Sequence, residues 1–318
     1  MSNVNPIGGY FELEVRNGEH YHQKAIRLNT ACNSFEYVLR VRQYRKVYIP
    51  YYTCEVMLKP LEKLGVDYEF YHINEIFEVT PLPTLKDGEA ILYTNYFGLK
   101  QAYVHYLTKV YGAKLIVDNA QAFFAEPISG IETFYSARKF FGVPDGAFLY
   151  TSKLLEQDIE QDVSYERMAH LLKRIELGAE AGYLDFKKND DYLCDVSIKM
   201  MSKLTESLLK GVDYELAKKK RRENYSVLDA QLGRTNKIHL ELDTNSVPLV
   251  YPYLTDDTAL KQKLIQHEVF VATYWPNVFE WCKPDDWEYE LAERTVFIPV
   301  DQRYCKEEMN RIIEIIKK

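Results

Sequence analysis

The chain has 318 residues, of which 47% are hydrophobic, and its 14 glycines and 12 prolines are too few for a low-complexity protein. It carries 40 Lys and Arg residues against 47 Asp and Glu residues, a formal net charge of −7. That balance argues against a broad, non-specific grip on nucleic acid or on an anionic membrane. The composition is instead typical of a globular α/β-type enzyme or binding protein, with one large domain or two modest ones.

The N-terminal segment, the length of the apolar runs and the cysteines narrow the class of protein further. Residues 1–16 lack the basic and then apolar pattern of a secretory signal, and no apolar run reaches the length of about 18 residues that a membrane-spanning helix needs. The five cysteines form no CxxC pair and leave an odd count, so we expect neither a zinc site nor a disulfide framework. We therefore expect a cytoplasmic protein without a metal.

Short apolar runs alternate with helical stretches between residues 24 and 150. The pattern predicts, in order, a helix at 35–42, a strand at 46–50, a helix at 53–64, strands at 68–71 and 90–93, a helix at 102–111, a strand at 114–117 and a strand pair at 132–136 and 146–151. Strands that alternate with helices indicate a mostly parallel sheet with helices on both faces.

The second half of the chain has a different pattern. Residues 153–230 are expected to be almost wholly helical, and a smaller α+β pattern follows from about residue 238. It contains an apolar run at 246–254, a helix at 257–267, a further apolar run at 293–299 and a terminal helix with one apolar face. We expect a large α/β domain over residues 1–205 and a small C-terminal α+β domain over residues 206–318.

Five consecutive basic residues occupy positions 218–222. A nucleic-acid or nuclear-targeting role is one interpretation of such a run. With a net charge of −7 and a helical context, a solvated helix face is the favoured one.

Asp118 directly follows the predicted strand at 114–117. In open parallel sheets, ligands bind in the crevice beyond the carboxyl ends of the strands. A carboxylate there can pair with a cation or with a protonated ring nitrogen. The alternative is that Asp118 only caps the segment 119–122.

Lys139 lies just past another predicted strand, among aromatic residues. A lysine held in an apolar pocket has a lowered pKa and can form a Schiff base with an aldehyde. The alternative is an ordinary solvated lysine.

Polar residues at 29–34 precede the predicted helix at 35–42. Hydroxyls and free N–H groups at a helix start form a phosphate cradle, although a plain N-cap by Thr30, Asn33 or Ser34 is equally compatible. No GxGxxG motif or P-loop lysine is present, which argues against NAD and ATP. A phosphate-binding helix start, a strand-end Asp and a strand-end Lys are together what pyridoxal 5'-phosphate (PLP) requires.

At these positions the sequence resembles the DegT/DnrJ/EryC1/StrS family of PLP-dependent aminotransferases. The resemblance runs in order over most of the chain. It rests on Asn29-Thr-Ala31, Tyr48-Ile-Pro-Tyr-Tyr-Thr53, Asn95-Tyr-Phe-Gly98, Ile116-Val-Asp-Asn-Ala-Gln121, Ser136-Ala-Arg-Lys139 with Pro144-Asp-Gly-Ala147, and Ala292-Glu-Arg-Thr-Val-Phe-Ile-Pro299. It implies a fold type I PLP-transferase, with a mostly parallel sheet between helices and a smaller C-terminal α+β domain.

The resemblance also implies roles for single residues. Lys139 would bind the cofactor covalently and then move protons, Asp118 would pair with its pyridine nitrogen, and Gln121 would lie beside its ring. Thr30 would bind the phosphate, with Ser136, and Asn29 would also belong to the residues that bind the cofactor. Active sites would lie at the interface of a homodimer, and the partner subunit would complete the phosphate site, for which Asn189 is a candidate.

Some positions depart from the family pattern. Cys54 stands where the family commonly has an aromatic residue that stacks on the cofactor ring, and Tyr52 or Tyr96 would have to substitute for it. The family's serine lies five residues before the lysine, where this chain has Phe134.

The reaction implied is the transfer of an amino group from an amino acid, glutamate, to a ketone, a keto sugar linked to a nucleotide. Such a reaction belongs to surface-polysaccharide or antibiotic-sugar assembly. A lysine at position 139, rather than a histidine, favours transamination over the family's dehydratase branch. Another PLP-dependent reaction, or a non-catalytic regulatory or binding protein on the same fold, remains as an alternative.

Overall fold

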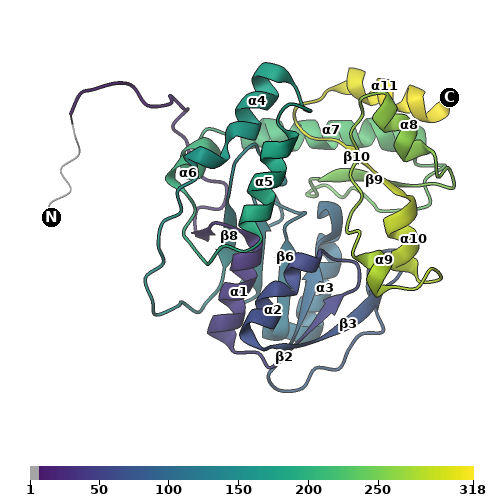
Figure 1. Cartoon of the computed structure of the whole chain (residues 1–318). Coiled ribbons are helices and arrows are strands. Elements are labelled where there is room, and N and C mark those ends of the chain that lie inside the picture. Colours follow the sequence, from purple (N-terminus) through teal and green to yellow (C-terminus); the bar gives the residue numbers. More distant parts are fainter. Residues whose placement is uncertain (1–6) are drawn as a thin grey trace.

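The computed structural model describes residues 7–318 (Figure 1). The expectation that no secretory signal is present falls partly on residues 1–6, which lie outside the described residues. The centre of the fold is an eight-stranded sheet with the strand order β1-β8-β7-β6-β5-β2-β3-β4. Its strands are β1 (Ile26–Leu28), β2 (Lys46–Pro50), β3 (Asp67–Ile73), β4 (Val79–Thr80), β5 (Glu89–Thr94), β6 (Leu115–Asn119), β7 (Glu132–Ser136) and β8 (Ala147–Tyr150).

Helices cover both faces of this sheet. In the first half of the chain they are α1 (Ala31–Arg42), α2 (Lys59–Leu64) and α3 (Gln101–Tyr111). Strand β6 illustrates why the sheet is buried on both sides: Ile116 packs into the apolar cluster under α1 and α2, whereas Leu115 and Val117 pack into the cluster under α3. This burial confirms the expected parallel sheet between helices, since β2, β3, β5, β6 and β7 pair in parallel and β8 is antiparallel to its neighbours.

The remaining helices and a second, two-stranded sheet follow in the chain. They are α4 (Ala169–Leu177), α5 (Tyr183–Leu193), α6 (Lys203–Lys210), α7 (Tyr214–Leu232), β9 (Val250–Leu254), α8 (Leu260–Gln266), α9 (Val278–Trp281), α10 (Trp287–Arg294), β10 (Thr295–Pro299) and α11 (Lys306–Lys317). Figure 1 shows α7, α8 and α11 beside the β9–β10 pair. The predicted division after residue 205 falls inside α6, and we propose that the C-terminal unit begins at α7.

Two predicted helical stretches differ from the structure. The predicted helix at 53–64 is divided into a short 3-10 helix at Glu55–Met57 and helix α2, which has Pro60 in its first turn. Proline lacks the N–H that a continuous helix would need there, so a new helix begins around it. Residues 151–164 contain no helix; the amides of Asp162 and Met200 instead bond the carbonyls of Met200 and Glu160.

None of the helices between residues 7 and 318 is long and apolar enough to cross a membrane.

Candidate active site

The register of the sheet brings the predicted site residues to one edge. Leu28 of β1 pairs with Ala147 of β8, and Ala147 pairs in turn with Ser136 of β7. Strand β6 lies on the other side of β7, with Asp118 opposite Phe134. Because β5, β6 and β7 run parallel, their carboxyl ends meet at this edge. The loop at 29–30, Asp118, Ser136 and Lys139 therefore gather at the carboxyl end of the sheet, where open α/β sheets bind ligands.

Asp118 is a buried carboxylate of this edge, with only 5% of its surface exposed. Its Oδ1 accepts a hydrogen bond of 2.8 Å from the Ala120 N–H, so Asp118 does cap the segment that follows it, and its pairing with a cofactor stays a prediction. Burial raises the pKa of Asp118 above its ordinary value, and the positive charge of Lys139 and the Ala120 N–H act in the opposite direction. The carboxylate thus lies near Lys139 and is incompletely compensated in its charged form.

Lys139 differs from the expectation in one respect. Its side chain is exposed, so it does not lie in an apolar pocket within one chain. Its neighbours in sequence are firmly held: Arg138 donates to the Asp190 carboxylate of α5 at 2.8 Å, and Phe140 is buried. The Lys139 charge reaches both Asp118 and Cys54, lowering the pKa of each against the larger effect of burial. The lysine is therefore an exposed group at the rim of a buried, polar edge.

Thr30 begins helix α1 in the way that a phosphate site would need. Its backbone is extended, and its Oγ1 accepts a 3.0 Å hydrogen bond from the Asn33 N–H. The first-turn N–H groups of a helix have no intrahelical partner, and the first turn of α1 contains no acidic residue. This helix start is therefore open to an anion, since the helix dipole also favours negative charge there.

Asn29, which is predicted to bind the cofactor, has a structural role in this chain. It is completely buried, and its Oδ1 accepts from the Thr30 N–H and from the side chain of Asn33. Its Nδ2 donates to the Ser197 carbonyl, and its own carbonyl accepts from the Gly146 N–H. Asn29 thus fastens the start of α1 to Gly146, before β8, and to the segment before α6, and its contact with the cofactor stays a prediction.

Gln121 and Ser136 are both buried at the edge, at 2% and 7% exposure. The Gln121 Oε1 accepts a 2.9 Å hydrogen bond from the N–H of Phe97, whose φ is +57°. That left-handed turn leads into Gly98, where a Cβ would lie 2.6 Å from the Val247 carbonyl oxygen. Gln121 therefore shapes the loop after β5. Its place beside a cofactor ring, like the phosphate contact of Ser136, stays a prediction.

Two expectations about neighbouring positions gain no support from the geometry of one chain. Tyr52 and Tyr96 are completely buried, because their rings pack against each other and against Trp275, so neither presents a face to a ligand. Asn189 is also buried and its Nδ2 donates to the Pro144 carbonyl of its own chain at 2.7 Å, while its Oδ1 accepts no hydrogen bond among the described residues.

Asp145 is a residue of this edge whose role sequence reasoning missed. It is completely buried, and its carboxylate accepts from the Ser202 N–H, the Ser202 hydroxyl and the Thr205 hydroxyl. The next residue, Gly146, has a φ of +118°, and a Cβ there would lie 2.9 Å from the Thr205 side chain. The Asp-Gly dipeptide was the only signal for this network, since the partners lie 57 and 60 residues further along the chain.

Comparisons with known proteins identify the fold. No family model matches the sequence, and no curated protein matches it. A putative sugar aminotransferase from Streptococcus pneumoniae in its PLP form is 16% identical with a TM-score of 0.65, covering 92% of this chain and 86% of that one. DesV from S. venezuelae, solved with a ketimine intermediate, is 14% identical with a TM-score of 0.64, covering 92% and 84%. A DegT DnrJ EryC1 StrS aminotransferase from Brucella abortus is 14% identical with a TM-score of 0.60, covering 92% and 85%.

The chain has the fold of the DegT/DnrJ/EryC1/StrS-type sugar aminotransferases. The expected fold type I is thereby confirmed over most of the chain. A dehydratase, GDP-4-keto-6-deoxymannose-3-dehydratase, shares it at 12% identity and a TM-score of 0.63, so this fold accommodates both reactions named in its solved structures.

Proposed function

We propose that the protein is a PLP-dependent aminotransferase. The observation that carries the proposal is that a buried carboxylate, Asp118, whose pKa is raised by burial, and an exposed lysine, Lys139, lie at the same edge of the sheet. A carboxylate in this state is stabilised by a cation that enters beside it, such as a protonated pyridine nitrogen. The open start of α1 at Thr30 lies at the same edge and favours an anion.

The residues present fit PLP by the chemistry of their groups. Thr30 and the first-turn N–H groups of α1 would bind the phosphate, with Ser136 beside them; Asp118 would hold the ring nitrogen protonated; and Lys139 would link to the aldehyde. When bound, the cofactor supplies an electron sink that labilises the bonds at the substrate's amino-bearing carbon. Lys139 would then carry the proton between substrate and cofactor, for which its exposed ammonium group is suited.

We infer an amino acid, glutamate, as the donor and a nucleotide-linked keto sugar as the acceptor. The acceptor class is supported by solved neighbours whose titles name sugar aminotransferases and a dehydratase with bound GDP-perosamine. On this proposal the protein acts in the cytoplasm, in the assembly of surface polysaccharides or antibiotic sugars.

We also propose that the protein works as a homodimer. Helices α4 and α5 form a hairpin that exposes large apolar side chains, with exposed fractions of 80% for Ile175, 70% for Leu177 and 73% for Leu184. The hairpin carries the Asp190 that holds Arg138, so it lies beside the candidate active site. A second copy of this chain is the occupant that would bury these side chains and place one subunit's surface next to the other's Lys139.

The test is a visible absorption spectrum of the purified protein with added PLP, repeated with glutamate. We expect a visible band from the covalent link at Lys139, and we expect glutamate to bleach it. Lys139→Ala should lose the band, whereas Lys153→Ala, which removes another exposed lysine just past a strand, should keep it. Borohydride trapping and mass spectrometry would place the link on Lys139.

The three interpretations give different results in this test. A band that glutamate does not bleach, with no amino transfer to any nucleotide-linked keto sugar, would indicate another PLP-dependent reaction. No band in the wild type, or the same band in Lys139→Ala, would refute the proposal and leave a non-catalytic protein on this fold.

A further inference from the structure

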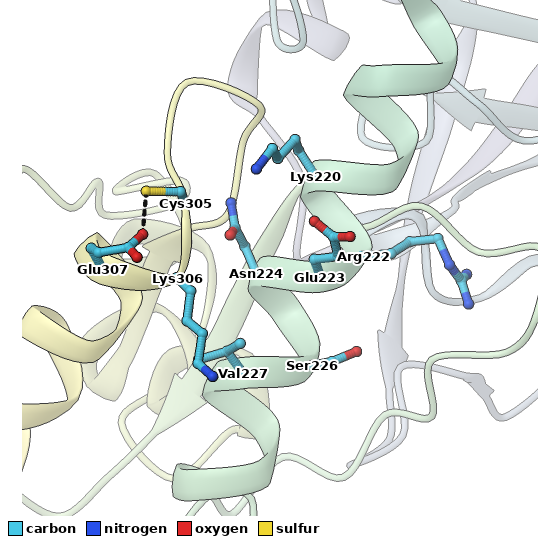
Figure 2. A pocket seen from close by; sticks show the side chains of 9 residues that line it. All are labelled: Lys220, Arg222, Glu223, Asn224, Ser226, Val227, Cys305, Lys306 and Glu307. Atoms are coloured by element: carbon cyan, nitrogen blue, oxygen red, sulfur yellow. Dashed lines mark hydrogen bonds between the residues drawn. The ribbon is translucent and has the colours of Figure 1, made fainter.

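The basic run at 218–222 is not a uniformly solvated helix face. Lys220 and Arg222 line an open pocket of about 530 Å³ between α7 and the start of α11 (Figure 2). Arg221 is only 1% exposed, which corrects the expectation for this residue. Lys219 is exposed and the other three residues of the run are half-buried, so Arg221 is the one member of the run that lies in the interior.

Arg221 is held by neutral groups. Its Nε donates to the Gln302 side-chain oxygen at 2.9 Å, and its Nη1 donates to the carbonyls of Pro248 and Leu249 at 3.2 and 3.1 Å. Its Nη2 donates to the Phe140 carbonyl at 3.3 Å, and its guanidinium lies 4.5 Å over the Phe140 ring. Burial lowers the pKa of Arg221 to about 10, with Asp301 acting in the opposite direction. A buried cation without a carboxylate in contact is a costly way to hold a structure together.

The Phe140 carbonyl connects the hydrogen bonds of Arg221 to the candidate active site. Gln302, in the loop after β10, also donates to it, at 2.8 Å from Nε2. Arg221, Gln302 and the Phe140 carbonyl thus form a closed set of three hydrogen bonds, which we call the clamp. Phe140 directly follows Lys139, in a segment between β7 and β8 that belongs to no helix or strand. Within the segment, the amides of Phe140 and Phe141 both bond the Ala137 carbonyl.

We propose that Arg221 and Gln302 are positioning residues that fix the main chain at Phe140 and thereby aim Lys139. The side chain of Lys139 is exposed, so its direction depends on its backbone. Arg138 is fastened on one side by Asp190, and the clamp fastens Phe140 on the other. The clamp comes from the C-terminal part of the chain, so the placement of the lysine depends on how that part packs on the sheet. That the clamp aims a cofactor-linked lysine rests on the proposed function. That the clamp holds the segment between β7 and β8 does not.

Gln302→Glu separates positioning from general stability. A glutamate keeps an oxygen for the Arg221 Nε–H and adds a counter-charge to the buried guanidinium, so the melting temperature should be unchanged or raised. It removes the Nε2–H donor and places a negative charge against the Phe140 carbonyl. We expect PLP to bind about tenfold more weakly, as measured by titration of the visible band, since the loss of one such hydrogen bond costs about a factor of ten. Gln231→Glu adds the same charge at an exposed position of α7 and should change neither measurement.

A second measurement does not depend on the cofactor. In the protein without PLP, hydrogen exchange at the Phe140, Phe141 and Val143 amides should become at least several-fold faster in Gln302→Glu and in Arg221→Met, and stay unchanged in Gln231→Glu. If exchange accelerates but the wild type forms no link at Lys139, the clamp stands and the proposed function fails. Unchanged exchange in both clamp variants, or unchanged PLP affinity in Gln302→Glu of a protein that does bind PLP, would overturn the inference.

Discussion

The carboxyl edge of the sheet and the α4–α5 hairpin show opposite patterns of side-chain burial. At the edge, polar groups such as Asp145 and Asn29 are completely buried, and each is hydrogen-bonded within the chain. On the hairpin, large apolar side chains such as Ile175 and Leu184 face solvent. These buried polar groups of the edge thus find their partners within one chain, whereas the exposed apolar side chains of the hairpin are the ones that the proposed second copy would cover.

The largest expected effect is at the edge, in Asp145→Ala. The substitution leaves the Ser202 N–H and the hydroxyls of Ser202 and Thr205 without their acceptor. Each buried donor left unpaired costs about 1–3 kcal/mol, so we expect the free energy of unfolding to fall by at least about 3 kcal/mol. Urea denaturation measures it, with the exposed Asp158→Ala as the control. Equal losses in the two variants would show that the buried network does not support the edge.

A second effect of similar size should appear on acidification. His22 is buried, with its Nε2 2.7 Å from the Phe123 carbonyl oxygen, and burial lowers its pKa to about 4 from 6.5. A group whose pKa is lower in the folded state stabilises the fold fully above pH 6.5 and loses that contribution as the pH falls toward 4. The loss corresponds to about 3 kcal/mol.

His22→Gln should remove this part of the pH dependence, because glutamine does not titrate and can still donate to the Phe123 carbonyl. The free energy of unfolding, measured by urea titration at several pH values, should therefore fall less steeply from pH 6.5 to 4 in the variant. Parallel curves for the variant and the wild type would contradict the assignment.

A smaller effect, of opposite sign, is expected at Asp118. Because burial raises its pKa, Asp118 stabilises the fold at low pH, and that contribution is lost as the pH rises through the folded-state pKa. At pH 7 the charged carboxylate is therefore a cost to the protein without its cofactor. Asp118→Asn keeps an oxygen for the Ala120 N–H and should raise the melting temperature by a few degrees, a gain on the order of 1 kcal/mol.

The same variant should bind PLP at least tenfold more weakly, since it cannot hold a ring nitrogen protonated. Calorimetry without the cofactor and titration of the visible band separate the two effects. A lower melting temperature at pH 7 together with undiminished PLP binding would show that the carboxylate is a structural cap alone.

Sequence patterns predicted the sheet well because each strand can be recognised from the apolar pattern of its own residues. A strand such as β6 has apolar residues on both faces, and a strand-end Asp and Lys need only the order of elements to be placed at one edge. The predicted helix at 53–64 is wrong for a local reason: Pro60 lies at the start of a new helix and not inside a longer one.

Long-range partners account for the other errors. Whether Arg221 faces solvent or the interior depends on the Phe140 carbonyl, 81 residues away, and no helical pattern contains that information. The hydrogen bond from the Asn29 Nδ2 to the Ser197 carbonyl, 168 residues later, is equally invisible in a local pattern. The exposure of Lys139 agrees with the alternative that the sequence left open, an ordinary solvated lysine, and on the dimer proposed above a second chain would supply the missing pocket.

The smallest effect on the stability of one chain is expected on the hairpin, and it is the sharpest test of the contrast between the two regions. Leu184→Glu places a charge on a side chain that is 73% exposed, so the monomer's free energy of unfolding should change by no more than about 0.5 kcal/mol. In a homodimer closed through this hairpin the same charge is buried at the interface twice, by symmetry, and the variant should be monomeric by light scattering at micromolar concentration. Leu216→Glu, at a leucine that is 50% exposed on α7, should leave the dimer intact. A wild type that is itself monomeric, or a Leu184→Glu variant that remains dimeric, would refute the dimer through this surface. If the variant is monomeric and also binds PLP more weakly, then the exposed lysine at one chain's edge is completed by the other chain's hairpin, and the two regions form one site.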